Sequence, residues 1–133
     1  MNNQVELDTK ARLSTLWIVV LLNMLFADIF SIMVELVNKN TLRIPGEVTT
    51  TMAIAAIVTN IPILMIYFSR VLTHGANRRA NITAGVLTIV YVIGGGDWAP
   101  HYLIIATIEV VVLLVIITRA WQWTNPEKVY RQC

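Results

Sequence analysis

Two carboxylic acids stand inside long apolar runs of this sequence. Asp28 interrupts NMLFADIFSIMVELVN, and Glu109 interrupts HYLIIATIEVVVLLVIIT. A charged carboxylate in hydrocarbon costs several kcal/mol unless it is paired, solvated or protonated. Acids in such runs can bind a proton or a cation, so these two are the first candidates for chemistry.

A stripe of polar residues continues from Asp28 along the same apolar run. Glu35 follows one heptad later, which places the two acids about 20° apart around a straight helix. Ser31 lies between them on the same side, whereas Asn23 lies off the stripe, roughly 140° from Asp28 at about 100° per residue. The stripe predicts a polar path toward one end of this helix.

Three further polar groups stand near the acids or in the middle of an apolar run. His101 begins the last run, and Asp97 precedes it in a glycine-rich loop. Asn60 stands beside Pro62 in TNIPILM, where the proline removes a helix hydrogen bond and predicts a kink. The candidate residues for proton or solute binding are therefore Asp28, Glu35, Asn60, His101 and Glu109.

Each candidate also has a structural explanation. A protonated carboxyl can hold helices together by hydrogen bonds, and Asn60 with Pro62 can act as interhelical contact and kink. Glu35 can reach outer water, and His101 can cap a helix at the membrane interface. The two histidines, His74 and His101, fall on opposite sides of the expected membrane, so no metal site is expected, and no cofactor is expected either.

The composition is that of a membrane protein. Hydrophobic residues make up 56% of the chain and charged residues 14%, with a mean hydropathy of +0.66, against roughly 25% charged residues in a typical soluble domain. The net charge of +2 and the lack of a basic run argue against a nucleic-acid partner. The single cysteine, Cys133, excludes a disulfide framework and a dithiol redox enzyme.

The spacing of Lys and Arg predicts four membrane spans. None occurs between Arg12 and Lys39, between Arg43 and Arg70, or between Arg79 and Arg119. A span needs roughly 20 residues, so the first two gaps hold one span each and the third holds two. GGGDWAP divides the third gap, because the glycines release a helix and Asp97 with Pro100 forms the capped start of the next. The expected spans in a single domain of residues 1–133 are about 13–37, 48–68, 80–95 and 101–121.

Short connections between these spans predict an all-α fold, a four-helix antiparallel transmembrane bundle. Eight of the ten basic residues then fall on the side of both termini, and Lys39 and Arg43 fall on the other. This bias predicts that both termini are cytoplasmic. The expected interfacial aromatic residues are Trp17, Tyr67, Trp121 and Trp123 at the inner side, and Tyr91, Trp98 and Tyr102 at the outer side.

The two deep acids should lie at similar depth. Asp28 lies about 4.5 Å outward of Leu25, the midpoint of its span, and Glu109 lies about 3 Å outward of Val111. The first and fourth helices of an antiparallel bundle are commonly neighbours, so the acids can share the interior. With no Lys or Arg inside the spans, they can stay uncharged by sharing protons as a pair, or they can face a water-filled cavity.

Several segments together resemble an uncharacterised family of small four-span bacterial membrane proteins, a domain of unknown function. They are LNMLFADIFSIMVELVN, IPGEV, MAIAAIVTNIPILMI, YVIGG and PHY, and the likeness covers the chain from about Leu13 to Trp123. The resemblance implies a multi-pass protein of the bacterial plasma (inner) membrane and implies no activity. All the candidate site residues fall within the range that the likeness covers.

The chain is also similar to the small multidrug exporters in size, in number of spans and in having an acid within the first span. It departs from them in its second deep acid and in its strong charge bias, which opposes the dual insertion seen in many of those exporters. The comparison is an analogy of fold class.

Three functions are compatible with these patterns. The favoured one is a proton-coupled transporter or permease of an unknown small solute, in which Asp28 and Glu109 bind a proton or a cation and the kink at Pro62 allows gating. The alternative is an intramembrane binding or assembly subunit. A lipid-modifying enzyme using an acid and His101 is less favoured. The expected partners are the lipid bilayer, a proton or small solute, and a second copy in a homodimer.

Overall fold

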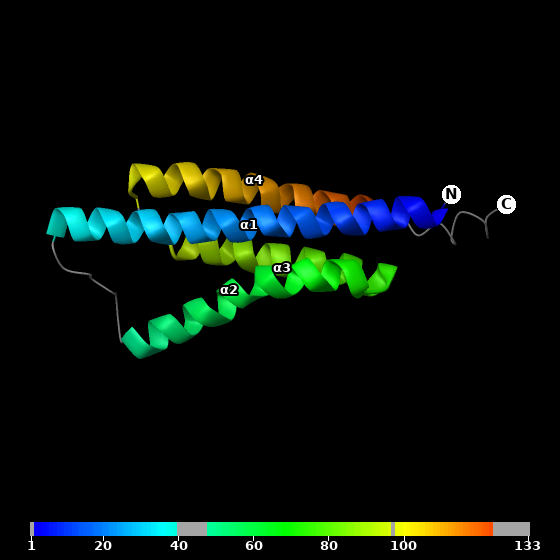
Figure 1. Ribbon diagram of the computed structural model, residues 1–133, viewed down its shortest axis with the longest axis horizontal. Helices are drawn as coiled ribbons and strands as arrows, with labels where there is room; N and C mark the ends of the chain where they lie inside the picture. The colour runs from blue at the N-terminus through cyan, green and yellow to red at the C-terminus, as the bar shows by residue number, and fades with distance from the viewer. Residues whose placement is uncertain (1, 40–47, 97, 124–133) are drawn as a thin grey trace.

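The computed structural model describes residues 2–39, 48–96 and 98–123, which form four α-helices and contain no strand. They are α1 (Asn2–Lys39), α2 (Val48–Val71), α3 (His74–Gly94) and α4 (Pro100–Gln122), drawn in Figure 1. The expectation of an all-helical fold is therefore confirmed for the described part of the chain.

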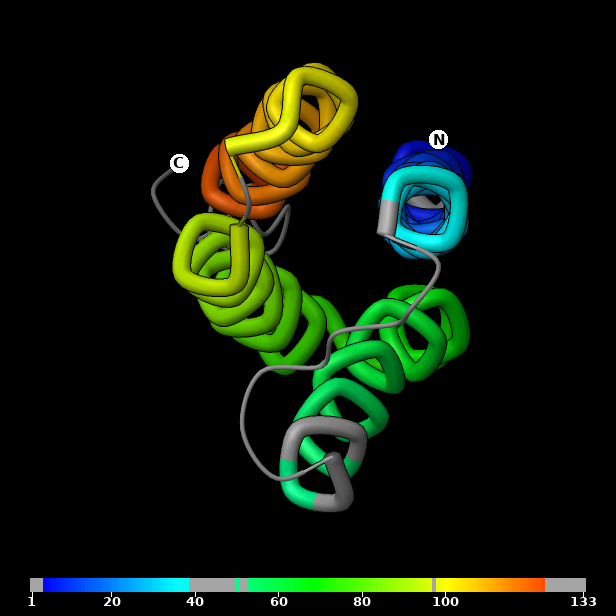
Figure 2. The backbone as a smooth tube through the Cα atoms, turned by 90° about the vertical axis from the view of Figure 1, so that its left-hand side faces the viewer, coloured from blue at the N-terminus to red at the C-terminus, as the bar shows by residue number. Residues whose placement is uncertain are grey.

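Each helix packs against two neighbours. α1 lies against α2 and α4, and α3 lies against α4 and α2. Figure 2 shows α1, α2, α3 and α4 in this order around the long axis. Consecutive helices run in opposite directions (Figure 1). We call the end that holds the start of α1, the α2–α3 connection and the end of α4 the terminal half, and the opposite end the distal half.

Three of the four helices are long and apolar enough to cross a membrane. The qualifying segments are Gln4–Asn38 in α1, Ala53–Val71 in α2 and Pro100–Gln122 in α4. Every helix also exposes large apolar side chains, and Phe26, Ile57, Val90 and Ile104 are each more than half exposed. Apolar surface on this scale is unfavourable in water, so the fold indicates a membrane protein.

α1 begins well before its apolar run. Lys10 Nζ lies 2.8 Å from Glu6 Oε1, an i,i+4 pair that supports the first turns. With 38 residues the helix is about 57 Å long at about 1.5 Å per residue, against about 30 Å of hydrocarbon. The first turns of α1 therefore extend beyond the thickness of a bilayer core.

The glycine run ends α3, and a proline begins α4. The Gly95 N–H donates to the Tyr91 carbonyl at 2.8 Å and closes the last turn of α3. Pro100 occupies the first helical position of α4, where its missing N–H costs nothing, and Ala99 precedes it without a capping side chain. Asp97, the expected capping residue, lies outside the described residues.

The core is concentrated in the terminal half. Among the α2 side chains that the structure describes, Pro62, Met65 and Ser69 are buried, all in the second part of the helix, whereas residues 53–60 are partly or fully exposed. Figure 1 shows the first part of α2 running obliquely away from the other helices and its second part running beside them. Pro62 lies between these parts, where a missing backbone hydrogen bond permits a bend.

A small-residue face brings α3 close to α4. The buried residues of α3 include Asn81, Gly85 and Thr88, which are spaced along one face of the helix. A Cβ added at Gly85 would lie 2.9 Å from Ile117 Cγ1, so a larger residue does not fit without displacing Ile117. The absence of a side chain at Gly85 sets the approach of the two helices.

Gly85→Leu should destabilise the protein by about 1–3 kcal/mol, because overpacking forces the helices apart. The matched control is Gly75→Leu, since a Cβ at Gly75 meets nothing within 4 Å. The measurement is the free energy of unfolding in mixed detergent micelles, followed by circular dichroism. Equal effects of the two substitutions would contradict the close approach of α3 and α4.

Candidate functional site

A hydrogen-bonded cluster of four buried side chains, the terminal polar cluster, lies inside the terminal half. Its members are Trp17, Ser69, Asn77 and Asn81, each with 0% of its surface exposed. Trp17 Nε1–H donates to Asn81 Oδ1 at 2.7 Å, and Ser69 Oγ donates to the same oxygen at 3.2 Å. Asn81 thus links α1, α2 and α3 through one amide oxygen.

The amide nitrogens of this cluster are also hydrogen-bonded. Asn77 Nδ2 donates to the Ser69 carbonyl at 2.6 Å, and Asn81 Nδ2 donates to the Asn77 carbonyl at 2.9 Å. Beside the cluster, Ser14 Oγ donates to the Ile66 carbonyl at 2.9 Å and accepts from Arg70 Nε at 3.1 Å. Buried polar groups that are paired in this way hold helices together and fix a single arrangement.

The terminal polar cluster corrects one sequence prediction and adds residues that the sequence analysis missed. Trp17 does not face the membrane interface as expected, because its indole is fully buried and bonded to Asn81. Asn77 was not singled out. Its spacing of one helical turn from Asn81, followed by Ala84 and Gly85, is the signal that could have identified a buried polar face on α3.

Glu109 lies in the interior of the distal half. Its side chain is on the buried face of α4, in line with Leu113, Ile116 and Ala120, and only 2% of its surface is exposed. Glu109 Oε1 is buried and makes no hydrogen bond with the described residues. A carboxyl group in such a place is stable in its protonated, uncharged form or with a bound cation.

Asp28 lies near Glu109 but is not enclosed with it. The two carboxyl groups, on the adjacent helices α1 and α4, lie within electrostatic range of each other and of the hydroxyl groups of Tyr91 and Tyr102. Asp28 itself is exposed on α1. The sequence predicts a common depth for the two acids, and in the structure they lie on adjacent helices, Glu109 buried and Asp28 exposed.

Two more buried polar atoms in this region make no hydrogen bond with the described residues. They are Asn23 Nδ2 on α1 and His101 Nε2 at the start of α4. Asn23 was set aside in the sequence analysis because it lies off the Asp28 stripe. Asn23 follows Leu16 by one heptad, so the two side chains share one face of α1. In the structure Leu16 faces the end of α4, which puts Asn23 on the α4 side of α1.

The remaining candidates lie farther from Glu109. Glu35 and Ser31 are partly exposed on α1, beyond Asp28 in the distal half. Asn60 is exposed, and its Nδ2 donates to the Ala56 carbonyl of its own helix at 2.8 Å. Because α2 packs on α1 and α3 rather than on α4, Asn60 is not brought next to Glu109. The site therefore centres on Glu109, Asp28, Tyr91 and Tyr102.

Tyr102 closes the distal end of this site. Its hydroxyl donates to the Val92 carbonyl at 2.7 Å and so ties the start of α4 to the end of α3. Tyr102 precedes Glu109 by one heptad, so both side chains lie on the same face of α4. The sequence predicts that Tyr102 is an interfacial residue. The structure places its hydroxyl group within electrostatic range of Glu109 and Asp28.

Comparison with known protein families gives a match that covers almost the whole chain. The family model of DUF6326, described as a family of unknown function, matches residues 4–129. The chain belongs to DUF6326. No curated protein and no solved structure shows significant similarity to it.

Membership of DUF6326 confirms the resemblance to an uncharacterised family but provides no activity. The matched range includes Asp28 and Glu109 and the whole terminal polar cluster. Any function for this DUF6326 protein has to be argued from the chemistry of these side chains.

Asn81→Ala should lower the free energy of unfolding by about 1–2 kcal/mol, because it leaves the buried Trp17 N–H and Ser69 hydroxyl without their shared acceptor. The control is Asn60→Ala, since Asn60 is exposed and bonds only within α2. Unfolding in mixed micelles, followed by tryptophan fluorescence, gives both values. Equal stability of the two variants would contradict a structural role for the terminal polar cluster.

Proposed function

We propose that this protein is a proton-coupled transporter of a small cationic solute in the bacterial plasma membrane. Its four helices form an antiparallel bundle of four spans, with both termini in the cytoplasm. The terminal half is then the cytoplasmic half, and the distal half opens toward the outside.

The observation that supports this proposal best is the burial of the Glu109 carboxyl group. Its carboxyl group is buried in the middle of an apolar helix, one of its oxygens has no hydrogen bond within the described residues, and no Lys or Arg lies in the expected span. Such a group can exchange a proton for a cation at little cost, because either ligand neutralises it. A purely structural carboxyl would instead have both oxygens hydrogen-bonded.

Access to Glu109 comes from the distal half. Asp28 lies at the edge of the helices, and Ser31 and Glu35 continue from it along α1 toward the distal end. The first part of α2, which precedes Pro62, leans away from the other helices (Figure 1). A cation entering from outside would meet Glu35 and Asp28 before it reaches Glu109, and the proton would leave by the same route.

The terminal polar cluster forms the inner barrier in this proposal. It links α1, α2 and α3 on the terminal side of the acids, and its polar atoms are hydrogen-bonded to one another. Release of the solute to the cytoplasm requires the bond between Trp17 and Asn81 to open while the distal half closes. The bend at Pro62 is the hinge about which the first part of α2 moves.

The charge distribution supports the proposed orientation. Arg12 on α1, Arg70 at the end of α2, Arg78 and Arg79 on α3 and Arg119 near the end of α4 all belong to the terminal half. An excess of Arg and Lys marks the cytoplasmic side of membrane proteins. Arg43, Lys128 and Arg131, which also enter the sequence prediction, lie outside the described residues.

A second candidate is an assembly subunit, and the exposure of Asp28 favours it. In a single copy this carboxyl group faces the surroundings at mid-span, where hydrocarbon disfavours it. A second copy packed on α1 would cover Asp28, so a homodimer is compatible with transport and with assembly alike. The lipid-modifying enzyme is less well supported, because His101 and Glu109 lie eight residues, or about 12 Å, apart along α4.

The decisive experiment measures proton flux in liposomes containing the purified protein and an enclosed pH-sensitive dye. An inward gradient of tetraphenylphosphonium, followed by other small cations, should drive protons outward through the parent protein. Glu109→Gln should abolish this flux, and Asp28→Asn should slow it by about tenfold or more, the equivalent of one lost charged contact. The control is Thr107→Val, since Thr107 is exposed on α4 and bonds only to the Leu103 carbonyl.

Two outcomes of this experiment contradict transport. One is unchanged flux in both Glu109→Gln and Asp28→Asn for every cation that the parent protein moves. The other is no cation-driven proton flux in the parent, together with a change in the size of the Asp28→Asn variant on detergent chromatography. The second outcome favours the assembly subunit.

A further inference from the structure

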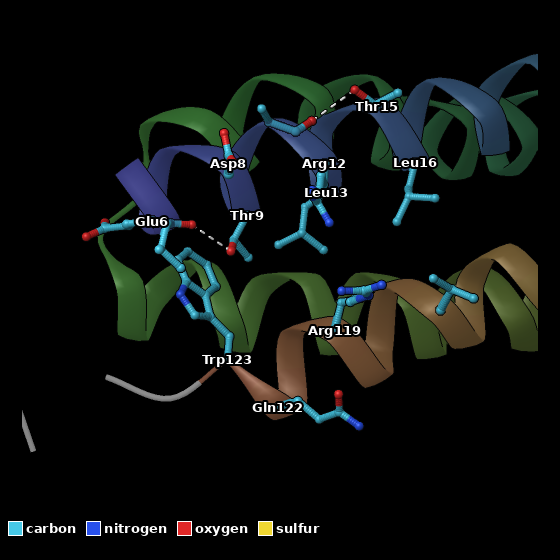
Figure 3. Close-up of a pocket in the computed structure, with 13 residues that line it drawn as sticks. Glu6, Asp8, Thr9, Arg12, Leu13, Thr15, Leu16, Arg119, Gln122 and Trp123 are labelled. Atoms are coloured by element: carbon cyan, nitrogen blue, oxygen red, sulfur yellow. Dashed lines mark hydrogen bonds between the residues drawn. The ribbon is translucent and has the colours of Figure 1, made fainter. Parts of the chain in front are cut away.

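A groove separates the first turns of α1 from the last turns of α4, in the terminal half of the protein. Its volume is about 870 Å³. Leu13, Leu16 and Val115 give it an apolar wall, and Arg12 and Arg119 line it from the two facing helices (Figure 3). A cavity of this size is large enough for an organic ligand rather than a single ion.

Both arginines are available to a ligand. In Figure 3 their side chains extend into the space between α1 and α4. Neither makes a hydrogen bond or ion pair with any residue that the structure describes. Two guanidinium groups that face one groove without a partner favour an anion that both can contact.

The acidic residues of the groove do not neutralise these arginines. Glu6 is paired with Lys10 at 2.8 Å. In Figure 3 the Asp8 carboxylate points away from α4, on the opposite side of α1 from Arg119. Two acidic and two basic side chains line the groove, and the two arginines are the ones that extend between the helices (Figure 3).

The groove lies at the level of a membrane interface. It is placed where the apolar run of α1 begins and the apolar run of α4 ends, and Trp123 stands at its end. The arginines are nearest that edge, whereas Leu16 and Val115 lie deeper along the same helices. A ligand that fits this order has an anionic head and an apolar tail.

We propose that this groove binds one anionic phospholipid, with its phosphodiester between Arg12 and Arg119 and an acyl chain along Leu16 and Val115. The two helices contribute one arginine each, so the bound lipid connects the start of α1 to the end of α4. The inference requires that the helices lie in a membrane, but it does not depend on transport.

Native mass spectrometry of the protein in detergent, with equal amounts of phosphatidylglycerol and phosphatidylcholine, tests this proposal. The parent protein should retain phosphatidylglycerol by about tenfold or more over phosphatidylcholine, as expected for two arginines near one phosphodiester. The double variant Arg12→Gln/Arg119→Gln should lose this preference. The double variant Arg12→Lys/Arg119→Lys should keep part of it, because it keeps both charges.

Two control variants separate the groove from general surface charge and from the acid site. Arg79→Gln removes an equally exposed arginine outside the groove and should leave the preference unchanged. Glu109→Gln should also leave it unchanged, so failure of the transport proposal and failure of this one are distinguishable. Glycerol phosphate, the headgroup without acyl chains, should not displace the lipid.

Any of four results would overturn the lipid site. They are equal retention of the two lipids by the parent protein, an undiminished preference in the Arg12→Gln/Arg119→Gln variant, an equal loss in Arg79→Gln, and displacement of the lipid by glycerol phosphate. The last result would identify a site for soluble anions instead.

Discussion

A polar atom buried in hydrocarbon must find a hydrogen bond within the protein, and the two halves of this molecule meet that constraint differently. In the terminal half, Trp17, Asn81 and their neighbours are bonded to one another across three helices. Asn23 and Glu109 near mid-span, and His101 at the distal end of α4, each have a buried polar atom without a bond to the described residues. The buried polar groups of the terminal half are therefore hydrogen-bonded, whereas those from mid-span outward are suited to binding a proton or a cation.

The bend in α2 separates these two halves. After Pro62 the second part of α2 contributes Met65 and Ser69 to the core, whereas residues 53–60 are largely exposed.

The two halves of the protein also suit different ligands. The distal half has acids and suits a cation, whereas the groove between α1 and α4 has two arginines that pair with none of the described residues and suits an anionic lipid. A lipid in that groove would strengthen the contact between α1 and α4 without touching the acids.

The sequence predicted those features that depend on local chemistry. The end of α3 at the glycine run and the start of α4 at Pro100 follow from backbone preferences. The position of Glu109 near the middle of α4 follows from counting residues along a helix. The direction in which Trp17, Asn77 and Asp28 point could not be predicted, because it depends on which faces of neighbouring helices meet, and that is decided by packing over the whole chain.

The central claim is that Glu109 takes up and releases a proton inside the membrane. Infrared difference spectroscopy of the protein in lipid, between acidic and alkaline buffer, detects the C=O stretch of a protonated carboxyl directly. The account predicts such a band from an apolar environment, titrating with pH, lost in Glu109→Gln and retained in Glu6→Gln. A band that persists unchanged in Glu109→Gln, or its absence from the parent protein at every pH, would contradict the account.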